Sequence, residues 1–385
     1  MFNFLKNLHS LRILSFNVVS TLKQDATIQT LNDLTQLYQL KSLDINIKAN
    51  DPACFEILSQ TLDKFQELKV LCVQFGKISG KNVQELLLKN ATKIASQLSK
   101  ISHLDLELYL NSSYKDLFEQ FLCGLENMNN LISLNLLIDR HKSSFQEILV
   151  FPNTSQSILS KTKYLNLEGA KVGMGLDLAK YFLSKMKNLR VCCLKNVELG
   201  GKVGSEDEME DMGSYLLENK ELKELKLVYQ KEFVAKPLEN LFRNIGKFDK
   251  LQLFSLQLHN QETLSLDLEC LVNMIRSLGN TDTIVIEILF PIKIKGSLLN
   301  RLFENFTKLK RLSAIKLDLR LAEEVKGSSL KKLFQMGNLD IITLLIEGMK
   351  LGKDDQIYIK EASKKLKKMT SCLIECEEFK FDKKF

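Results

Sequence analysis

The sequence predicts an α/β fold, a solenoid of about 13 repeats with a parallel β-sheet on its concave face and α-helices on its convex face. Three observations lead to this prediction. A pair of apolar residues recurs about every 30 residues along the whole chain. The segments after many of these pairs carry apolar residues at helical spacing. One such copy is too short to bury its own apolar face, whereas stacked copies bury each other's.

Thirteen apolar pairs of the form L-x-L define the repeat. Alternation of this kind is typical of a short strand with one buried face, so each pair predicts a strand. The intervals between the pairs run from 27 to 33 residues. The first residues of the pairs are Leu14, Leu43, Leu71, Leu104, Leu134, Leu165, Cys192, Leu225, Phe254, Ile284, Leu312, Ile342 and Cys372.

The eleventh pair is ambiguous. Leu312-Ser313-Ala314 is followed directly by Ile315, Leu317 and Leu319, so its register is open to a slip of one residue. Pro291 is expected in the loop that precedes this copy.

Helical spacing follows the strand pairs. Leu117, Phe121, Leu125 and Met128 fall at i, i+4, i+8 and i+11, which predicts a helix with one apolar face. Phe55, Leu58, Leu62 and Phe65 show a similar pattern. Glycines such as Gly76 and Gly169 suit the turn from strand to helix.

The fuller pattern L-x-x-L-x-x-L-x-L, as in Leu37-Leu40-Leu43-Ile45, resembles the leucine-rich repeat family. The period and the full helix in each copy are similar to its ribonuclease-inhibitor-like subclass, over essentially the whole chain. This resemblance implies a horseshoe solenoid and a role in binding other proteins. The Asn or Cys that the family carries after L-x-L is mostly absent, with residues such as Gly76, Tyr109 and Asp139 at or near that place.

We expect a single leucine-rich repeat domain over residues 1–385, because no low-complexity linker interrupts the repeats. The last repeat and a polar cap occupy about residues 353–385. The N-terminal edge, around Phe2, Phe4, Leu8 and Phe16, has no polar cap. This edge either frays, docks another chain or continues from a longer parent sequence.

The composition argues against several classes of protein. Hydrophobic residues make up 45% of the chain, which excludes a disordered or collagen-like protein. No stretch reaches the roughly 20 unbroken apolar residues of a membrane helix, so no transmembrane segment is expected. Only eight of the 54 basic residues are Arg. A net charge of +7 that rests on Lys argues against nucleic acid as a partner and resembles the composition of AT-rich protists.

The eight cysteines lack any zinc-binding spacing, and Cys192 and Cys372 replace Leu in the repeat. They predict free thiols and a reducing compartment, which favours the cytoplasm. Association with a cytoskeletal or ciliary complex is an open alternative.

No segment predicts catalysis, a cofactor or a metal site, so the chain is expected not to be an enzyme. Gly76–Asn82 is one residue short of a phosphate-binding loop and has Asn in place of its hydroxyl residue. The acidic run Ser205–Asp211 is better explained as the solvated start of a helix than as a cation or phosphorylation site. The Lys-rich segment 360–368 is expected on the outer face of the last helix.

The residues between and beside each apolar pair should face outward on the concave sheet, and these are the candidate protein-binding residues. Their first half is acidic and rich in amides, their middle is basic, and their last third is apolar. This grading predicts a partner with a basic segment in the acidic half and an apolar anchor at the far end. The candidates are Asp44, His103, Asp105, Glu107, Asn135, Asn166, Glu168, Lys195, Lys226, Val285, Ile315 and Leu345.

The sequence therefore predicts a non-enzymatic protein-interaction scaffold, for example a structural subunit of a larger assembly. One alternative is an adaptor that recognises substrates for ubiquitin ligation or regulates a small GTPase. The GTPase version would need an Arg near the face, and Arg190 and Arg311 are the candidates. A less favoured alternative is nucleic-acid or membrane binding through the Lys-rich convex side.

Overall fold

The computed structural model divides into two compact units, Met1–Leu189 (unit 1) and Arg190–Phe385 (unit 2). It describes residues 8–18, 24–47, 52–62, 64–75, 81–97, 99–110, 114–140, 158–169, 176–197, 212–229, 235–259, 268–366 and 368–384.

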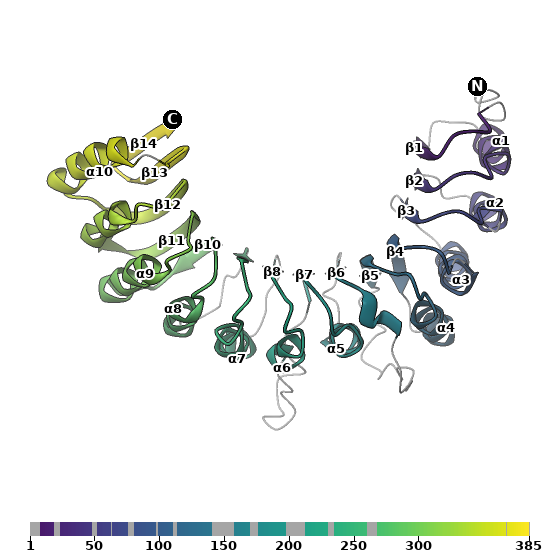
Figure 1. Ribbon diagram of the computed structural model, residues 1–385, viewed down its shortest axis with the longest axis horizontal. Helices are drawn as coiled ribbons and strands as arrows, with labels where there is room; N and C mark the ends of the chain where they lie inside the picture. The colour runs from purple at the N-terminus through teal and green to yellow at the C-terminus, as the bar shows by residue number, and fades with distance from the viewer. Residues whose placement is uncertain are drawn as a thin grey trace. The chain divides into compact units, whose positions relative to one another are not determined.

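Unit 1 alternates strands with helical segments. Neighbouring strands pair in parallel and in chain order. Figure 1 shows the described helices of unit 1 on one side of its sheet. The strands are β1 (Ile13–Val18), β2 (Ser42–Ile47), β3 (Val70–Phe75), β4 (His103–Leu110), β5 (Ser133–Arg140) and β6 (Tyr164–Gly169). The helices are α1 (Gln24–Leu34), α2 (Pro52–Leu62), α3 (Lys81–Gln97), α4 (Lys115–Glu126), the 3₁₀ helix η3 (Ile158–Lys161) and α5 (Leu176–Lys185).

Unit 2 repeats this architecture, again with its described helices on one side of the sheet (Figure 1). Its strands are β7 (Val191–Lys195), β8 (Glu224–Tyr229), β9 (Leu253–Leu258), β10 (Thr283–Ile292), β11 (Ala314–Lys326), β12 (Ile341–Lys350), β13 (Ser371–Glu377) and β14 (Phe379–Lys384). Its helices are α6 (Met212–Leu217), α7 (Ala235–Ile245), α8 (Leu268–Ser277), α9 (Gly296–Lys308), the 3₁₀ helix η5 (Ser328–Gln335) and α10 (Lys353–Lys365).

Both units have the fold of a leucine-rich repeat solenoid, as predicted. In the part of the chain that the structure describes, β1–β6 and β7–β13 supply the thirteen strands expected from the thirteen apolar pairs. Strand β14 differs because it pairs antiparallel with β13. The polar residues expected to follow the last repeat as a simple cap thus form a hairpin that covers the edge of β13.

The apolar pairs form the core. Leu43 and Ile45 of β2 are fully buried, whereas Asp44 between them is exposed. The predicted helical faces are buried against the strands, since Phe121 and Leu125 of α4 are also inaccessible to solvent. The two periodicities read from the sequence therefore correspond to the two layers of each unit.

Buried threonines connect successive repeats. Thr61, Thr162 and Thr281 each donate a hydrogen bond to a backbone carbonyl 30 or 31 residues earlier, at 3.1–3.3 Å. All three side chains are almost completely buried. The acceptor of Thr61 is a carbonyl of α1, whereas those of Thr162 and Thr281 lie just before a strand. Each bond satisfies a buried donor at the junction between two repeats.

The predicted register of the eleventh repeat was wrong. Ile315, not Leu312, pairs with Ile284 of β10 and with Ile342 of β12. The full pattern L-x-x-L-x-x-L-x-L is present as Leu309-Leu312-Ile315-Leu317, so Leu312 occupies the buried turn before the strand. The shift is three residues, which keeps the turn of this repeat in line with its neighbours.

Strands β10, β11 and β12 are longer than the others and carry register shifts near their ends. Pro291, expected in a loop, lies in β10 just after one of these shifts. Proline is tolerated at such an irregularity because its missing N–H breaks no regular ladder bond.

Candidate functional site: the open face of the sheet

In each unit, the sheet face opposite the described helices is called the open face here, and its side chains alternate with the buried pairs. In unit 1, the residues between the two apolar positions form a column across six strands, which we call the polar column. Its members are Ser15, Asp44, Cys72, Asp105, Asn135 and Asn166.

Hydrogen bonds link the polar column from strand to strand. Asn166 Nδ2 donates to Asn135 Oδ1 and Asn135 Nδ2 donates to Asp105 Oδ2, each at 2.7 Å. At the other end, Ser15 Oγ donates to Asp44 Oδ2 at 2.9 Å. Neighbouring strands are about 4.8 Å apart, which suits direct bonds between short polar side chains.

The thiol of Cys72 bridges the two acidic members of the column. Burial raises the pKa of this thiol, and the nearby carboxylates of Asp105 and Asp44 raise it further. A thiol in this setting stays protonated, so it acts as a hydrogen-bond donor and not as a nucleophile.

Asp105 is the most desolvated carboxyl of the column. Burial raises its pKa, while hydrogen bonds from Asn135 and Cys72 oppose that rise. The charge of Asp44 adds to the rise. A cation supplied from outside would therefore stabilise the ionised form of Asp105.

The flanking columns make the open face of unit 1 acidic overall. Glu107 and Glu168 lie half-buried on β4 and β6, on either side of Leu137, and His103 is exposed at the start of β4. Over the three outward columns of β1–β6, four residues are Asp or Glu and none is Lys or Arg. This surface has the charge opposite to that of the whole chain, which carries +7.

The open face of unit 2 is mixed. Lys195 on β7 and Lys226 on β8 are half-buried, and Lys226 Nζ lies 3.6 Å from Glu224 Oε2. Further along, Lys316 on β11 forms an ion pair with Glu287 on β10. The sequence pattern did not predict Lys316 as an outward residue, because the strand of the eleventh repeat was expected three residues too early.

The prediction that the last third of the face is apolar was wrong in part. Ile315 is 1% exposed and belongs to the core, so it is not a surface residue. Val285 on β10 and Leu345 on β12 do face outward, but Lys316 and Asp318 of β11 lie between these strands. The structure therefore does not bring the three apolar candidates together.

A cavity of about 790 Å³ opens where β11, β12 and β13 end. Six carboxylates line it, together with Arg320, Leu345 and Gly348: Asp318, Glu323, Glu324, Glu347, Glu375 and Glu377. Several of them are paired, since Lys350 Nζ lies 2.9 Å from Glu324 and Lys380 Nζ lies 2.7 Å from Glu375. Burial and the charge of Glu287 raise the pKa of Asp318.

Several of the remaining sequence candidates fall outside the part of the chain that the structure describes. These are Phe2, Phe4, residues 76–80 of the glycine-containing segment and the acidic run Ser205–Asp211. Arg311 forms an ion pair with Asp282 at 3.2 Å. Within the described ranges, no group of His, Cys, Asp and Glu has the arrangement of a metal site. Among the described helices, none combines the length and the apolar character that a membrane span needs.

No protein-family model and no curated protein matches the chain. A chain from the crystal structure of the yeast Rad7 and Elc1 complex matches over 89% of this chain and 80% of its own, with 12% identity and a TM-score of 0.44. A chain from the mouse RP105/MD-1 complex matches over 92% and 77%, with 13% identity and a TM-score of 0.29. These likenesses assign neither a family nor a partner.

Proposed function

We propose that this chain is a non-enzymatic scaffold that binds a protein partner, and that the open face of unit 1 takes a basic segment of that partner. The observation that carries the proposal is the acidic open face. In the described strands β1–β6, its three outward columns hold Asp44, Asp105, Glu107 and Glu168 and no Lys or Arg. A surface of one charge sign steers an oppositely charged partner toward it and fixes the register of binding.

The dimensions of the face suit an extended peptide. Asp44 on β2 and Glu168 on β6 are four strands apart, or about 19 Å at the usual strand spacing. An extended segment of about six residues spans that distance. Lys or Arg at alternate positions of such a segment would reach the carboxylates, while the amides of Asn135 and Asn166 offer hydrogen bonds to its backbone.

Charge reversal tests this proposal. Asp44→Lys, Asp105→Lys and Glu168→Lys together should abolish retention of Lys- and Arg-rich peptides from an immobilised library of 15-residue peptides. The matched control reverses Glu56, Glu85 and Asp116, which lie on the helices of unit 1, and changes the net charge equally. Retention by the face variant equal to that of the unmodified chain, or selection of acidic peptides, would refute the proposal.

The proposal also covers the repeat subclass, the domain organisation, the compartment and the cellular role of the chain. The helix-rich repeats support the ribonuclease-inhibitor-like subclass and a single repeat domain over residues 1–385. The eight cysteines, all unpaired with one another, support a reducing compartment such as the cytoplasm. We propose a structural subunit of a larger assembly as the role of the chain, because the open face of unit 1 offers a surface for binding another protein.

A further inference from the structure

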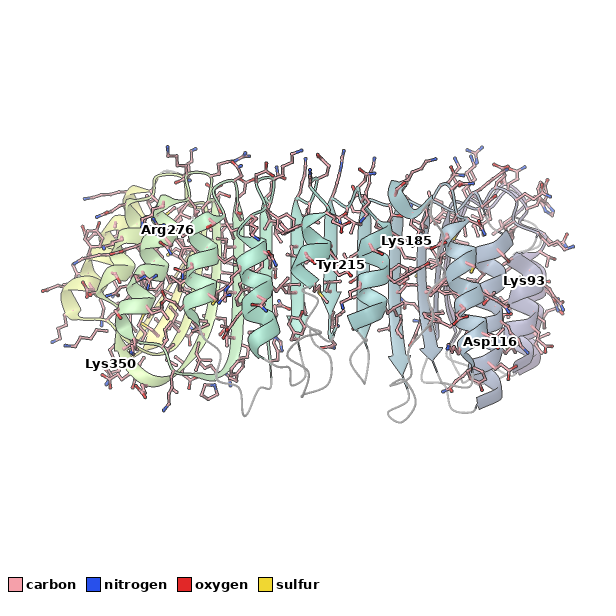
Figure 2. All side chains as sticks on the ribbon, turned by 90° about the horizontal axis from the view of Figure 1, so that it is seen from below. Lys93, Asp116, Lys185, Tyr215, Arg276 and Lys350 are labelled. Atoms are coloured by element: carbon pink, nitrogen blue, oxygen red, sulfur yellow. The ribbon has the colours of Figure 1, made fainter. Side chains whose placement is uncertain are left out.

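Unit 1 carries a second charged surface, of the opposite sign, at the edge where its strands begin. The backbone N–H of Lys41 donates to the carbonyl of Arg12, and that of Lys69 donates to the carbonyl of Lys41, both at 2.8 Å. The three residues are exposed and stand on successive repeats, about 4.8 Å apart. Figure 2 shows many nitrogen-tipped side chains along this edge, on the side from which the strand arrows run.

Two more lysines join this row. Lys64 lies in the turn after α2, and Lys100 Nζ lies 2.9 Å from Glu67 Oε1. The hydrogen bond and charge of Lys100, with the charges of Lys41 and Lys69, lower the pKa of Glu67. We call Arg12, Lys41, Lys64, Lys69 and Lys100 the basic edge; with Glu67 among them, its net charge is five minus one, or +4.

The fold does not require these cations. The same backbone ladder continues through Ser102 and Ile132, which are neutral, and only then reaches Lys163. Like charges on neighbouring strands repel each other and lower stability. A row of adjacent cations at positions that accept Ser or Ile is therefore better explained by an anionic partner than by folding.

Aromatic and apolar side chains accompany the basic edge. Tyr38 is 55% exposed and lines a shallow cavity of about 550 Å³ together with Arg12, Lys41 and Lys64. Leu8 is 38% exposed and precedes His9, whose ring nitrogen lies 3.4 Å from the carbonyl of Gln36 in the neighbouring turn. Tyrosine is favoured at the boundary between water and lipid, where its ring and its hydroxyl meet different surroundings.

We propose that the basic edge of unit 1 binds the surface of a membrane that contains anionic lipids. Clusters of four to eight Lys and Arg residues are typical of surfaces that attract phosphatidylserine-rich leaflets. Four of the five cations are Lys, which suits attraction by charge and lacks the bidentate geometry with which Arg reads nucleic acid. The strands run away from this edge, so edge-on docking keeps the acidic open face off the membrane.

Vesicle co-sedimentation of the full chain tests the proposal. We expect binding to vesicles of phosphatidylcholine with about 30% phosphatidylserine, loss of binding at about 0.5 M salt, and no binding to pure phosphatidylcholine. The variant with Arg12→Glu, Lys41→Glu and Lys69→Glu should bind at least about tenfold more weakly. Its fold is checked by circular dichroism.

The matched control carries Lys295→Glu, Lys326→Glu and Lys353→Glu, three exposed positions of unit 2, and has the same net charge. It should bind the vesicles as the unmodified chain does. Equal loss in the control would show that net charge alone acts and would overturn the proposal. Binding to single-stranded RNA that is tighter than vesicle binding and is lost in the Arg12, Lys41 and Lys69 variant would overturn it in favour of nucleic acid.

Discussion

The hydroxyl of Tyr181 donates a hydrogen bond of 2.6 Å to Glu126 Oε1, although the two residues are 55 positions apart. Lys185 Nζ lies 3.4 Å from the same carboxylate oxygen. Glu126 ends α4, whereas Tyr181 and Lys185 lie on α5, and the 3₁₀ helix η3 comes between them in the chain. This buried contact therefore connects repeats that are not consecutive.

Loss of the Tyr181 hydroxyl should destabilise unit 1. Glu126 is only 5% exposed, so its carboxylate depends on protein donors in place of water. Tyr181→Phe is expected to lower the free energy of unfolding by about 1–3 kcal/mol, measured by urea denaturation. The control Tyr38→Phe removes a hydroxyl from a side chain that is 55% exposed and should change it by less than about 0.5 kcal/mol. Equal effects of the two changes would contradict the role of the contact.

Asp105 should make stability depend on pH. Burial raises its folded-state pKa above the ordinary value of about 3.9, so the folded chain holds the proton more tightly than the unfolded chain does. The stability that Asp105 contributes is therefore present at low pH and is lost as the pH rises through the folded-state pKa. Asp105→Asn cannot ionise, so the variant should not lose this stability as the pH rises.

The measurement is a comparison of unfolding free energies for Asp105→Asn and the unmodified chain between pH 4 and 7, a window of about three units above the ordinary pKa. The unfolding free energy of Asp105→Asn should increase relative to that of the unmodified chain as the pH rises. A difference that stays constant, or that moves the other way, would show that burial does not raise the pKa of Asp105.

The register of β11 can be tested by truncation. Ile315 is 1% exposed, and Ile315→Ala should cost about 2–5 kcal/mol of unfolding free energy. Leu345 faces outward on β12, and Leu345→Ala should cost less than about 1 kcal/mol. Chemical denaturation of the two variants shows which substitution lowers the unfolding free energy more. A larger decrease for Leu345→Ala than for Ile315→Ala would refute the register of β11.

Much of the fold could be predicted from the period of the sequence alone. The alternation around Leu43 and Ile45 assigns both the core and the outward column, so the sequence alone predicts that Asp44, Asp105 and Asn135 share one column. The strand register of the eleventh repeat could not be predicted, because Leu312, Ile315 and Leu317 are all apolar and allow more than one starting point. Only the alignment with Ile284 and Ile342 decides between the starting points.

Features that depend on contacts between repeats could not be predicted. The bond from Thr281 to the carbonyl of Leu251 needs the stacking geometry, and so do the hydrogen bonds between the Cys72 thiol and the carboxylates of Asp44 and Asp105. The basic edge did leave a signal, since Arg12, Lys41 and Lys69 each stand two residues before an apolar pair. Comparison of that column across the repeats would have revealed it.

Gly348 should tolerate no side chain. Its φ is +82°, and an added Cβ would lie 3.0 Å from Leu321 Cβ and 3.1 Å from the carbonyl oxygen of Leu321. Gly348→Ala is expected to cost about 1–3 kcal/mol of unfolding free energy by urea denaturation. Gly337→Ala is the control, because an added Cβ there meets no heavy atom within 4 Å. Gly348 lies in the carboxylate-lined cavity of unit 2, which is shaped by the close approach of β12 to β11. If Gly348→Ala costs no more unfolding free energy than the control, that close approach is wrong.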